Sequence, residues 1–376
     1  MENMATNKQL LFLCPHPINT APGQRLKYEQ YFAHIENAGY AITVSPFMTM
    51  PFWNIVYKKG YLFQKIRLTL YGYFMRIKIL FTLHKYDAVY VFLWATPFGF
   101  PIIEWAICKL NKNIIYDIDD MVFLGHSSTA NRFIERFKGT DKMIYLMQQA
   151  KHVIVCTPKL HEFVKQYNAN STDISSTINT DTYQIANEYT NHKRLVLGWS
   201  GSHSTSKYLL LLEPVLQKLK HEFDFEIRVI GDANFKFNEL AANAIAWNAS
   251  TEVADLQQID IGLYPLPNEE WVYGKSGLKA LQYMALGIPT VATAIGANYR
   301  VIEHEKSGYL ASSETEWYAA LKQLIENPSL RQTIGATARE RVVQHYSITA
   351  NKQTYIDIIT KVVATYFLIC IVINCT

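Results

Sequence analysis

Short apolar runs alternate with longer amphipathic stretches along this chain, and the alternation occurs twice. Strands that alternate with helices of this length predict parallel sheets with right-handed crossovers. A parallel sheet is covered on both faces, so its strands read as almost continuous apolar runs. The strand candidates are residues 10–14, 41–44, 88–93, 113–116 and 152–156 in the first half, and 195–199, 226–230, 259–264 and 289–292 in the second.

The chain has 376 residues, which is more than the ~250–300 residues that one core usually organises. A polar stretch, residues 187–194, separates the two alternating regions and is a candidate linker. We therefore predict two doubly wound, Rossmann-like α/β domains with parallel sheets that face each other across a cleft. The predicted domains are residues 1–190 and 191–346, followed by a C-terminal helix and apolar tail, 347–376, that packs back toward the first domain.

Composition narrows the class of protein further. With 49% hydrophobic and 18% charged residues, the chain is not a disordered protein. Its formal charge of +4 gives no reason to expect nucleic acid as a partner. The five cysteines are scattered without a metal or redox spacing, as in a reducing cytoplasm. No apolar run reaches the ~18–20 residues of a membrane helix, although residues 362–373 come closest. We expect a cytoplasmic protein.

The segment GKSGLKALQYMALGIP, residues 274–289, carries the most chemical information. Gly274, Lys275 and Gly277 precede a predicted helix that ends at a glycine. Free backbone amides at a helix start, together with a lysine, form an anion site. Ordinary turn glycines would give the same spacing, and the spacing alone leaves both interpretations open.

This segment resembles the C-terminal signature of group 1 (family 4) glycosyltransferases, which are retaining enzymes of the GT-B fold. The resemblance extends to GWSGS at 198–202, DIGLYPL at 260–266 and YDIDD at 116–120. It implies transfer of a sugar from a nucleotide-diphosphate donor to a glycan or lipid-linked acceptor, in cell-surface polysaccharide or glycolipid synthesis. The donor would be a substrate bound mainly by the second domain, with the acceptor on the first and with neither cofactor nor metal.

Two departures from the family pattern affect the expected donor site. Many members carry two glutamates eight positions apart, the second of which contacts the donor ribose, where this chain has Gly274 and Gln282. An amide can still bond ribose hydroxyls, and Glu270 is a neighbour for the sugar. The family arginine after the first strand of the second domain is also replaced, by Trp199 and Ser200. The diphosphate then depends mainly on Lys275, with Lys279, Lys207 or Arg25 as helpers.

Further site residues follow from the loops at strand ends. Gly201 and Ser202 would offer backbone amides to the diphosphate, with Ser202 or Ser204 capping the next helix; the plain alternative is a helix cap alone. In the first domain, Gly23 and Arg25 would approach the donor phosphate and the acceptor. The alternative for them is a turn with a solvated arginine.

The acidic run around Asp119 and the histidine that follows complete the predicted site. Asp119, with Asp120, is expected in the cleft near the acceptor, and His126 is a candidate active-site histidine. A rival interpretation gives the carboxylates a divalent metal, as in the other glycosyltransferase fold class. The simplest one is an acidic loop that pairs with a basic residue, beside a surface histidine. The predicted catalytic residues are thus Lys275, Asp119 and His126.

Residues 51–86 carry seven lysines and arginines, ten aromatic residues and no Asp or Glu. This combination suits an anionic membrane surface. No recognition motif for nucleic acid accompanies it. Amphipathic helices with a solvated basic face are the alternative, and we predict a peripheral position on the inner face of the cytoplasmic membrane.

Two other functions fit the same architecture. A sugar-nucleotide epimerase would isomerise the donor without an acceptor, using acid and base residues such as Asp119, Glu270 and His126. A non-catalytic sugar-nucleotide binder would explain the two missing glutamates.

Overall fold

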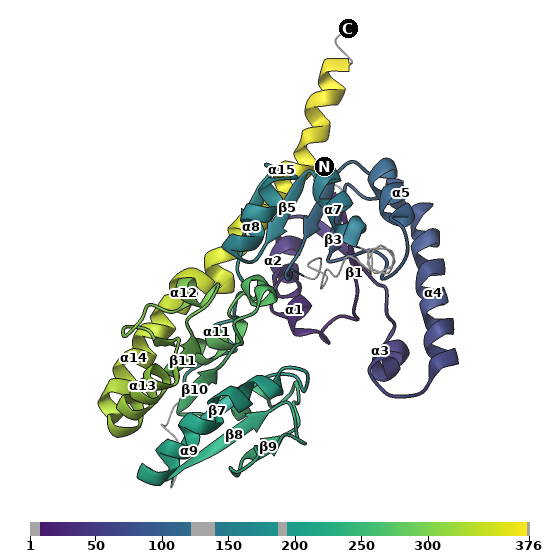
Figure 1. Cartoon of the computed structure of the whole chain (residues 1–376). Coiled ribbons are helices and arrows are strands. Elements are labelled where there is room, and N and C mark those ends of the chain that lie inside the picture. Colours follow the sequence, from purple (N-terminus) through teal and green to yellow (C-terminus); the bar gives the residue numbers. More distant parts are fainter. Residues whose placement is uncertain (1–7, 122–139, 187–193, 374–376) are drawn as a thin grey trace. The chain divides into compact units, whose positions relative to one another are not determined.

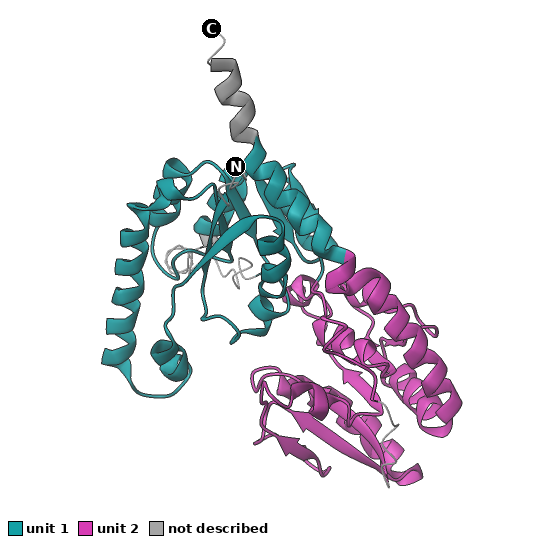
Figure 2. Cartoon of the chain, turned by 180° about the vertical axis from the view of Figure 1, so that it is seen from behind, with its two compact units in different colours: residues 1–175, 351–376 teal, residues 176–350 magenta. Residues whose placement is uncertain are grey.

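The computed structural model describes residues 8–121, 140–186 and 194–373, with side chains to residue 364 (Figure 1). The chain divides into two compact units, coloured separately in Figure 2. Unit 1 contains Met1–Ser175 and Asn351–Thr376, and unit 2 contains Ser176–Ala350. The domain boundaries at residues 190 and 346 stay a prediction, and each compact unit is described by itself.

Unit 1 is built on a six-stranded sheet whose order is β2-β1-β3-β4-β5-β6, with every pair parallel. The chain order reverses between β1 and β3. The strands are β1 (Lys8–Cys14), β2 (Tyr40–Pro46), β3 (Ala88–Phe92), β4 (Ile114–Asp117), β5 (His152–Val155) and β6 (Ser171–Asp173). The helices are α1 (Pro22–Arg25), η1 (Glu29–Tyr31), α2 (Phe32–Asn37), α3 (Met50–Val56), α4 (Leu62–Leu80), η2 (Leu83–Lys85), α5 (Ile102–Leu110), α7 (Thr140–Gln149) and α8 (Pro158–Lys165).

Unit 2 repeats this design in a second parallel sheet, with the order β12-β11-β10-β7-β8-β9. Apolar clusters lie under helices such as α11 on one part of the sheet and α9 and α13 on another. The predicted class, two doubly wound parallel-sheet domains of the GT-B type, is therefore confirmed. The strands are β7 (Leu195–Ser200), β8 (Phe225–Ile230), β9 (Asn243–Ile245), β10 (Ile261–Tyr264), β11 (Thr290–Thr293) and β12 (Tyr309–Ala311).

The helices of unit 2 differ in regularity. The segment after β7 starts as a 3-10 helix before it becomes α-helical at Glu213. The elements are η4 (Ser206–Leu212), α9 (Glu213–Glu222), α10 (Glu252–Leu256), η5 (Glu270–Gly274), α11 (Leu278–Ala285), α12 (Asn298–Val301), α13 (Glu314–Glu326), α14 (Pro328–Arg341) and the π-helical η6 (Val342–Tyr346).

The final helix, α15 (Ile348–Ile373), continues from unit 2 into unit 1. In unit 1 its Tyr355 ring stacks on Tyr31 with 4.3 Å between ring centroids. The Thr360 hydroxyl shares a 2.9 Å hydrogen bond with Tyr40 at the start of β2. Within the described ranges, no helix combines the length and the apolar character that crossing a bilayer requires.

Residues 22–37 do not form one continuous helix. The segment is divided among α1, η1 and α2 because polar side chains in it turn inward. The fully buried Gln24 accepts a hydrogen bond from the His16 amide at 2.9 Å and donates one to Glu29 at 2.9 Å. Lys27 also turns inward and reaches Asp117 at the end of β4.

The buried ion pair of Lys27 and Asp117 fixes this segment to the sheet. Both side chains are at most 1% exposed, and Tyr90 of β3 donates a second hydrogen bond to Asp117. Burial lowers the pKa of Lys27, but the charge and hydrogen bond of Asp117, together with Cys156 and Asp119, more than offset that effect and hold the pKa above its ordinary value. The pair thus joins the segment between α1 and η1 to β3 and β4.

We predict that Lys27→Met lowers the free energy of unfolding of unit 1 by about 3–5 kcal/mol, because it leaves the Asp117 carboxylate buried without its cation. The double variant Lys27→Met/Asp117→Asn should recover part of this loss, since no buried charge remains. Urea denaturation followed by circular dichroism measures both. A loss below about 1 kcal/mol for the single variant, or no recovery in the double variant, would contradict the account.

Candidate nucleotide-sugar site

The candidate site of unit 2 lies at the carboxyl ends of β7 and β10. These neighbouring strands mark the position where the chain order reverses, with β8 and β9 on one side and β11 and β12 on the other. In open parallel sheets, such a switch point opens a crevice outside the carboxyl ends of the strands, where ligands bind. The segments that leave this edge begin at Gly201, Gly231 and Pro265.

Two glycines allow a close approach at this edge. Gly231 has a φ of +112°, and a Cβ there would lie 1.9 Å from the carbonyl oxygen of Gly201. A Cβ on Gly201 would lie 2.6 Å from Cε of Lys279 and 2.7 Å from the Trp199 ring. Glycine at position 231 therefore avoids the Gly201 carbonyl, and glycine at position 201 leaves room for the Lys279 side chain.

The amide of Gly201 is not available to a ligand, because it donates a 2.9 Å hydrogen bond to Ile230. Its expected role as an amide donor is therefore wrong, and the residue supplies space instead. The expected cap is wrong too, because no side chain caps η4. Ser202 shares a 2.9 Å hydrogen bond with Ser204, and Thr205 donates to the Ser202 carbonyl at 3.0 Å. These bonds make a tight turn in which the hydroxyls bond one another.

Helix α11 begins next to this turn region with its N-terminal amides aligned. Gly277 precedes the helix at a φ of +79°, and no side chain caps it. The preceding Ser276 hydroxyl lies 2.6 Å from the Ser176 hydroxyl. Tyr283 fixes the middle of the helix, since its hydroxyl accepts from the Ser200 amide at 2.7 Å. Helix α11 therefore directs its positive end toward the crevice.

Lys279, the second residue of α11, is half-buried and lies over two aromatic rings. Its Nζ lies 5.3 Å from the ring centroid of Trp199 and 5.4 Å from that of Tyr264. Burial and the nearby charge of Lys275 lower the pKa of Lys279 to about 8. Among the described residues, no carboxylate forms an ion pair that offsets these effects. A desolvated cation of this kind is most stable when an anion joins it.

Lys275 is half-buried and lies immediately before α11, with its Nζ 5.4 Å from the Trp271 ring centroid. Gly274, which ends η5, is buried beside it. The two lysines thus bring positive charge to the same end of α11. Lys207 lies on η4 with its Nζ 5.2 Å from the Tyr208 ring centroid, and Glu270 is exposed in η5.

Gln282, the expected ribose contact, belongs to a polar network that the sequence did not reveal. Its amide nitrogen donates to the Tyr183 hydroxyl at 2.9 Å and lies 3.4 Å from the Glu252 carboxylate. The indole of Trp247 donates to the same carboxylate at 3.0 Å. A buried glutamate from α10 therefore lies beside position 282. The sequence does not single out Glu252, because an acidic residue shortly after a predicted strand is too common a pattern.

In unit 1, the predicted residues Gly23 and Asp119 lie together. A Cβ on Gly23 would lie 2.5 Å from a carboxylate oxygen of Asp119, so a larger residue there would displace that carboxylate. Arg25 lies on α1 two residues further and is half-buried. Asp119 and Asp120 are half-buried beyond the end of β4. The parallel strands β1, β3 and β4 bring these loops to one edge.

Of the residues predicted for the site in unit 1, His126 lies outside the described residues. In the part of the chain that the structure describes, no three His, Cys, Asp or Glu side chains are grouped closely enough to hold a metal ion. Asp117, the first carboxylate of the acidic run, pairs with Lys27 as the simplest interpretation expected.

The comparisons with known proteins agree on this architecture. A family model described as "Glycosyl transferases group 1" matches residues 194–327, the range that contains β7, Lys275 and α11. Residues 194–327 are therefore similar in sequence to group 1 glycosyltransferases. The family resemblance predicted from the sequence is thus confirmed.

Related proteins share either part of the sequence or the fold. Glycosyltransferase 1 domain-containing protein 1 of Xenopus tropicalis is 30% identical over 102 residues, which is 27% of this chain and only 29% of that protein. Sucrose-phosphate synthase from Thermosynechococcus elongatus has a similar fold, with a TM-score of 0.69, 13% identity and coverage of 95% of this chain and 100% of that one. Anabaena HepE in complex with UDP and glucose follows, with a TM-score of 0.64, 16% identity and coverage of 94% and 100%.

We predict that Lys279 titrates near pH 8 in the free protein, because burial and Lys275 both disfavour its charge. Lys275→Met should raise the pKa of Lys279 toward the ordinary lysine value, since it removes the like charge. Side-chain NMR of ¹³C-labelled lysine measures the titration, and Lys279→Arg assigns the signal. Lys218→Met is the matched control, since Lys218 lies 4.0 Å from the Tyr318 ring centroid on another helix. No lysine titrating below pH 9.5 would contradict the account.

Proposed function

We propose that this chain is a retaining glycosyltransferase that transfers a sugar from a nucleotide-diphosphate donor to a glycan or lipid-linked acceptor. The observation that carries the proposal is the Lys279 ammonium, desolvated over Trp199 and Tyr264 at the strand ends of the region that is similar to group 1 glycosyltransferases. A donor diphosphate would supply the anion that this charge favours.

The same arrangement suits the chemistry of the transfer. When the bond between the sugar and the diphosphate breaks, negative charge grows on the leaving phosphate oxygens. Lys275, Lys279 and the uncapped N-terminus of α11 would stabilise that charge where it develops. In a front-face attack, the acceptor hydroxyl forms the new bond as the leaving phosphate departs and takes the hydroxyl proton. Such a reaction requires no separate base from the protein.

Residues of α11 and of the loops beside it would contact the sugar and the nucleoside. Gly274 and Gly277 would let the donor approach the backbone, and Gln282 would contact the ribose, with Glu252 beside it to hold its orientation. Ser202 would lie near the diphosphate. Because HepE is described in complex with UDP and glucose, a uridine diphosphate sugar is the donor to test first.

The acceptor side of the proposal rests on unit 1. Gly23, Arg25 and Asp119 lie at the strand ends there, and His126 stays a predicted member of the site. A lipid-linked acceptor would place the protein at the inner face of the cytoplasmic membrane, in polysaccharide or glycolipid synthesis. The basic and aromatic residues 51–86 support this position.

We predict that Lys275→Ala and Lys279→Ala each lower the rate of sugar transfer by about 10²–10³-fold, as expected when a preorganised charge at the leaving group is removed. Lys279→Arg should retain more activity than Lys279→Ala. Lys218→Ala, which removes a lysine over the half-buried Tyr318 ring of the same unit, should leave the rate unchanged.

The assay follows transfer to membrane-extract acceptors, hydrolysis of the donor and isomerisation of the donor in the same samples. Near-wild-type transfer by both alanine variants would overturn the roles given to the lysines. Isomerised donor in the absence of acceptor would instead establish an epimerase, and tight donor binding with no turnover on any extract would establish a binder.

A further inference from the structure

Helix α4 exposes a stripe of large apolar side chains. Gly72 and Arg76 are its buried residues. A Cβ on Gly72 would lie 2.7 Å from the Phe47 ring, so the helix packs closely there. The residues spaced three and four positions apart on the opposite side are 47% to 87% exposed, and they are Phe63, Ile66, Leu70, Phe74, Ile77 and Phe81. Surface helices of water-soluble proteins normally show the reverse arrangement.

A second exposed apolar segment adjoins this stripe. Figure 1 shows α5 beside α4, and the segment before α5 is bonded to Tyr73. The Tyr73 hydroxyl donates to the Phe98 carbonyl at 2.7 Å and accepts from the Phe98 amide at 3.1 Å. We call the α4 stripe together with its exposed neighbours the outer apolar face. The neighbours are Phe98, Phe100, Ile102 and Trp105, each 52% to 67% exposed.

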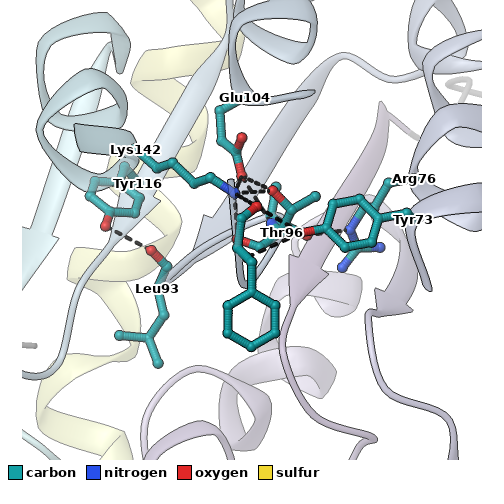
Figure 3. A network of polar contacts seen from close by, with 9 residues as sticks. Tyr73, Arg76, Leu93, Thr96, Glu104, Tyr116 and Lys142 are labelled. Atoms are coloured by element: carbon teal, nitrogen blue, oxygen red, sulfur yellow. Dashed lines mark hydrogen bonds and ion pairs between the residues drawn. The ribbon is translucent and has the colours of Figure 1, made fainter. Parts of the chain in front are cut away.

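A buried polar network fixes α4 in this orientation (Figure 3). The guanidinium of Arg76 donates to the carbonyls of Ala95 and Cys14 at 2.8 and 3.0 Å, and to the Ser45 hydroxyl at 2.8 Å. Burial lowers the pKa of Arg76 to about 10, so it is still charged at neutral pH. Rotating α4 to bury its apolar stripe would break all three hydrogen bonds.

A second cation supports the segment before α5. Lys142 of α7 donates to the Thr96 hydroxyl and to the Phe98 carbonyl, both at 2.6 Å, and lies 3.9 Å from the Glu104 carboxylate. Figure 3 shows these groups converging on one buried point. The exposed aromatic rings therefore project from a backbone that is held from within.

The charge around the face has one sign. Residues 51–86 contain no Asp or Glu, and Arg67 and Lys78 are exposed on α4 beside the apolar stripe. Lys58 and Lys59 are exposed in the turn before the helix, and Lys85 follows it. Apolar side chains flanked by lysine and arginine match the boundary between anionic lipid headgroups and acyl chains.

We infer that the outer apolar face binds the surface of an anionic lipid bilayer, with the α4 stripe at the level of the acyl chains and Arg67 and Lys78 at the phosphates. This inference deepens the membrane part of the proposed function. A second copy of the chain is a poorer occupant, because a symmetric contact through this face would oppose like charges. Lipid phosphate supplies the charge that the face lacks.

Vesicle co-sedimentation of the full chain tests the inference. Wild-type protein should bind vesicles of phosphatidylcholine with 30% phosphatidylglycerol much better than pure phosphatidylcholine, and binding should weaken as salt rises. Arg67→Glu/Lys78→Glu should weaken binding by about 30-fold or more, from about 1 kcal/mol per cation. Leu70→Ser/Ile77→Ser should weaken it by about tenfold or more, because two side chains lose their acyl contacts.

The control is Leu211→Ser/Val343→Ser, which changes two similarly exposed aliphatic residues of unit 2 and should bind vesicles as the wild type does. Equal binding by all variants, or binding that ignores lipid charge, would overturn the inference. The inference would also be overturned if the wild type were a dimer in sedimentation equilibrium and Leu70→Ser/Ile77→Ser dissociated that dimer. UDP affinity, measured on the same variants, should not change, so a failure here is distinct from a failure of the proposed donor site.

Discussion

The parallel pairing of β7 with β10 is the constraint on which the candidate site depends. It brings the carboxyl ends of two strands that are distant in sequence to one edge, where the chain order reverses. Trp199 and Tyr264 stand at these two ends, and Lys279 of α11 lies over both rings. The hydrogen bonds of Tyr283 to Ser200 hold the helix in that position. Two aromatic rings and a cation therefore meet where the carboxyl ends of β7 and β10 lie side by side.

The buried Lys27 and Arg76 and the half-buried Lys279 differ in how their charge is satisfied. Lys27 has the Asp117 carboxylate, Arg76 has two carbonyls and a hydroxyl, and both serve to join elements of unit 1. Lys279 has aromatic rings and a like charge near it. Desolvation and the like charge of Lys275 oppose the charge of Lys279, so a bound anion would stabilise it. Arg76 has its hydrogen-bond partners within the protein and is therefore structural, whereas Lys279 is a candidate to bind a ligand.

The sequence predicts the fold well because buried parallel strands must be apolar along their whole length, and residues 274–289 stand out because glycine and lysine precede a helix. It fails where side chains reach across the fold. The segment 22–37 is divided into three helices because Gln24 turns inward to its neighbours and Lys27 bonds to the distant Asp117. The Gly201 amide is used by the neighbouring strand. Glu252 beside Gln282, and α4 with its apolar side outward, depend on packing that no local pattern encodes.

The proposed donor site depends above all on the Lys279 ammonium, which would hold the donor diphosphate. The titration of this lysine with ligand bound tests that role most directly. NMR of ¹³C-labelled lysine in the presence of saturating UDP should show that the pKa of Lys279 rises from about 8, so that the side chain stays protonated at pH 9. Saturating uridine, which lacks the diphosphate, should leave the titration unchanged. An unchanged titration with UDP bound, or an equal rise with uridine, would contradict the claim.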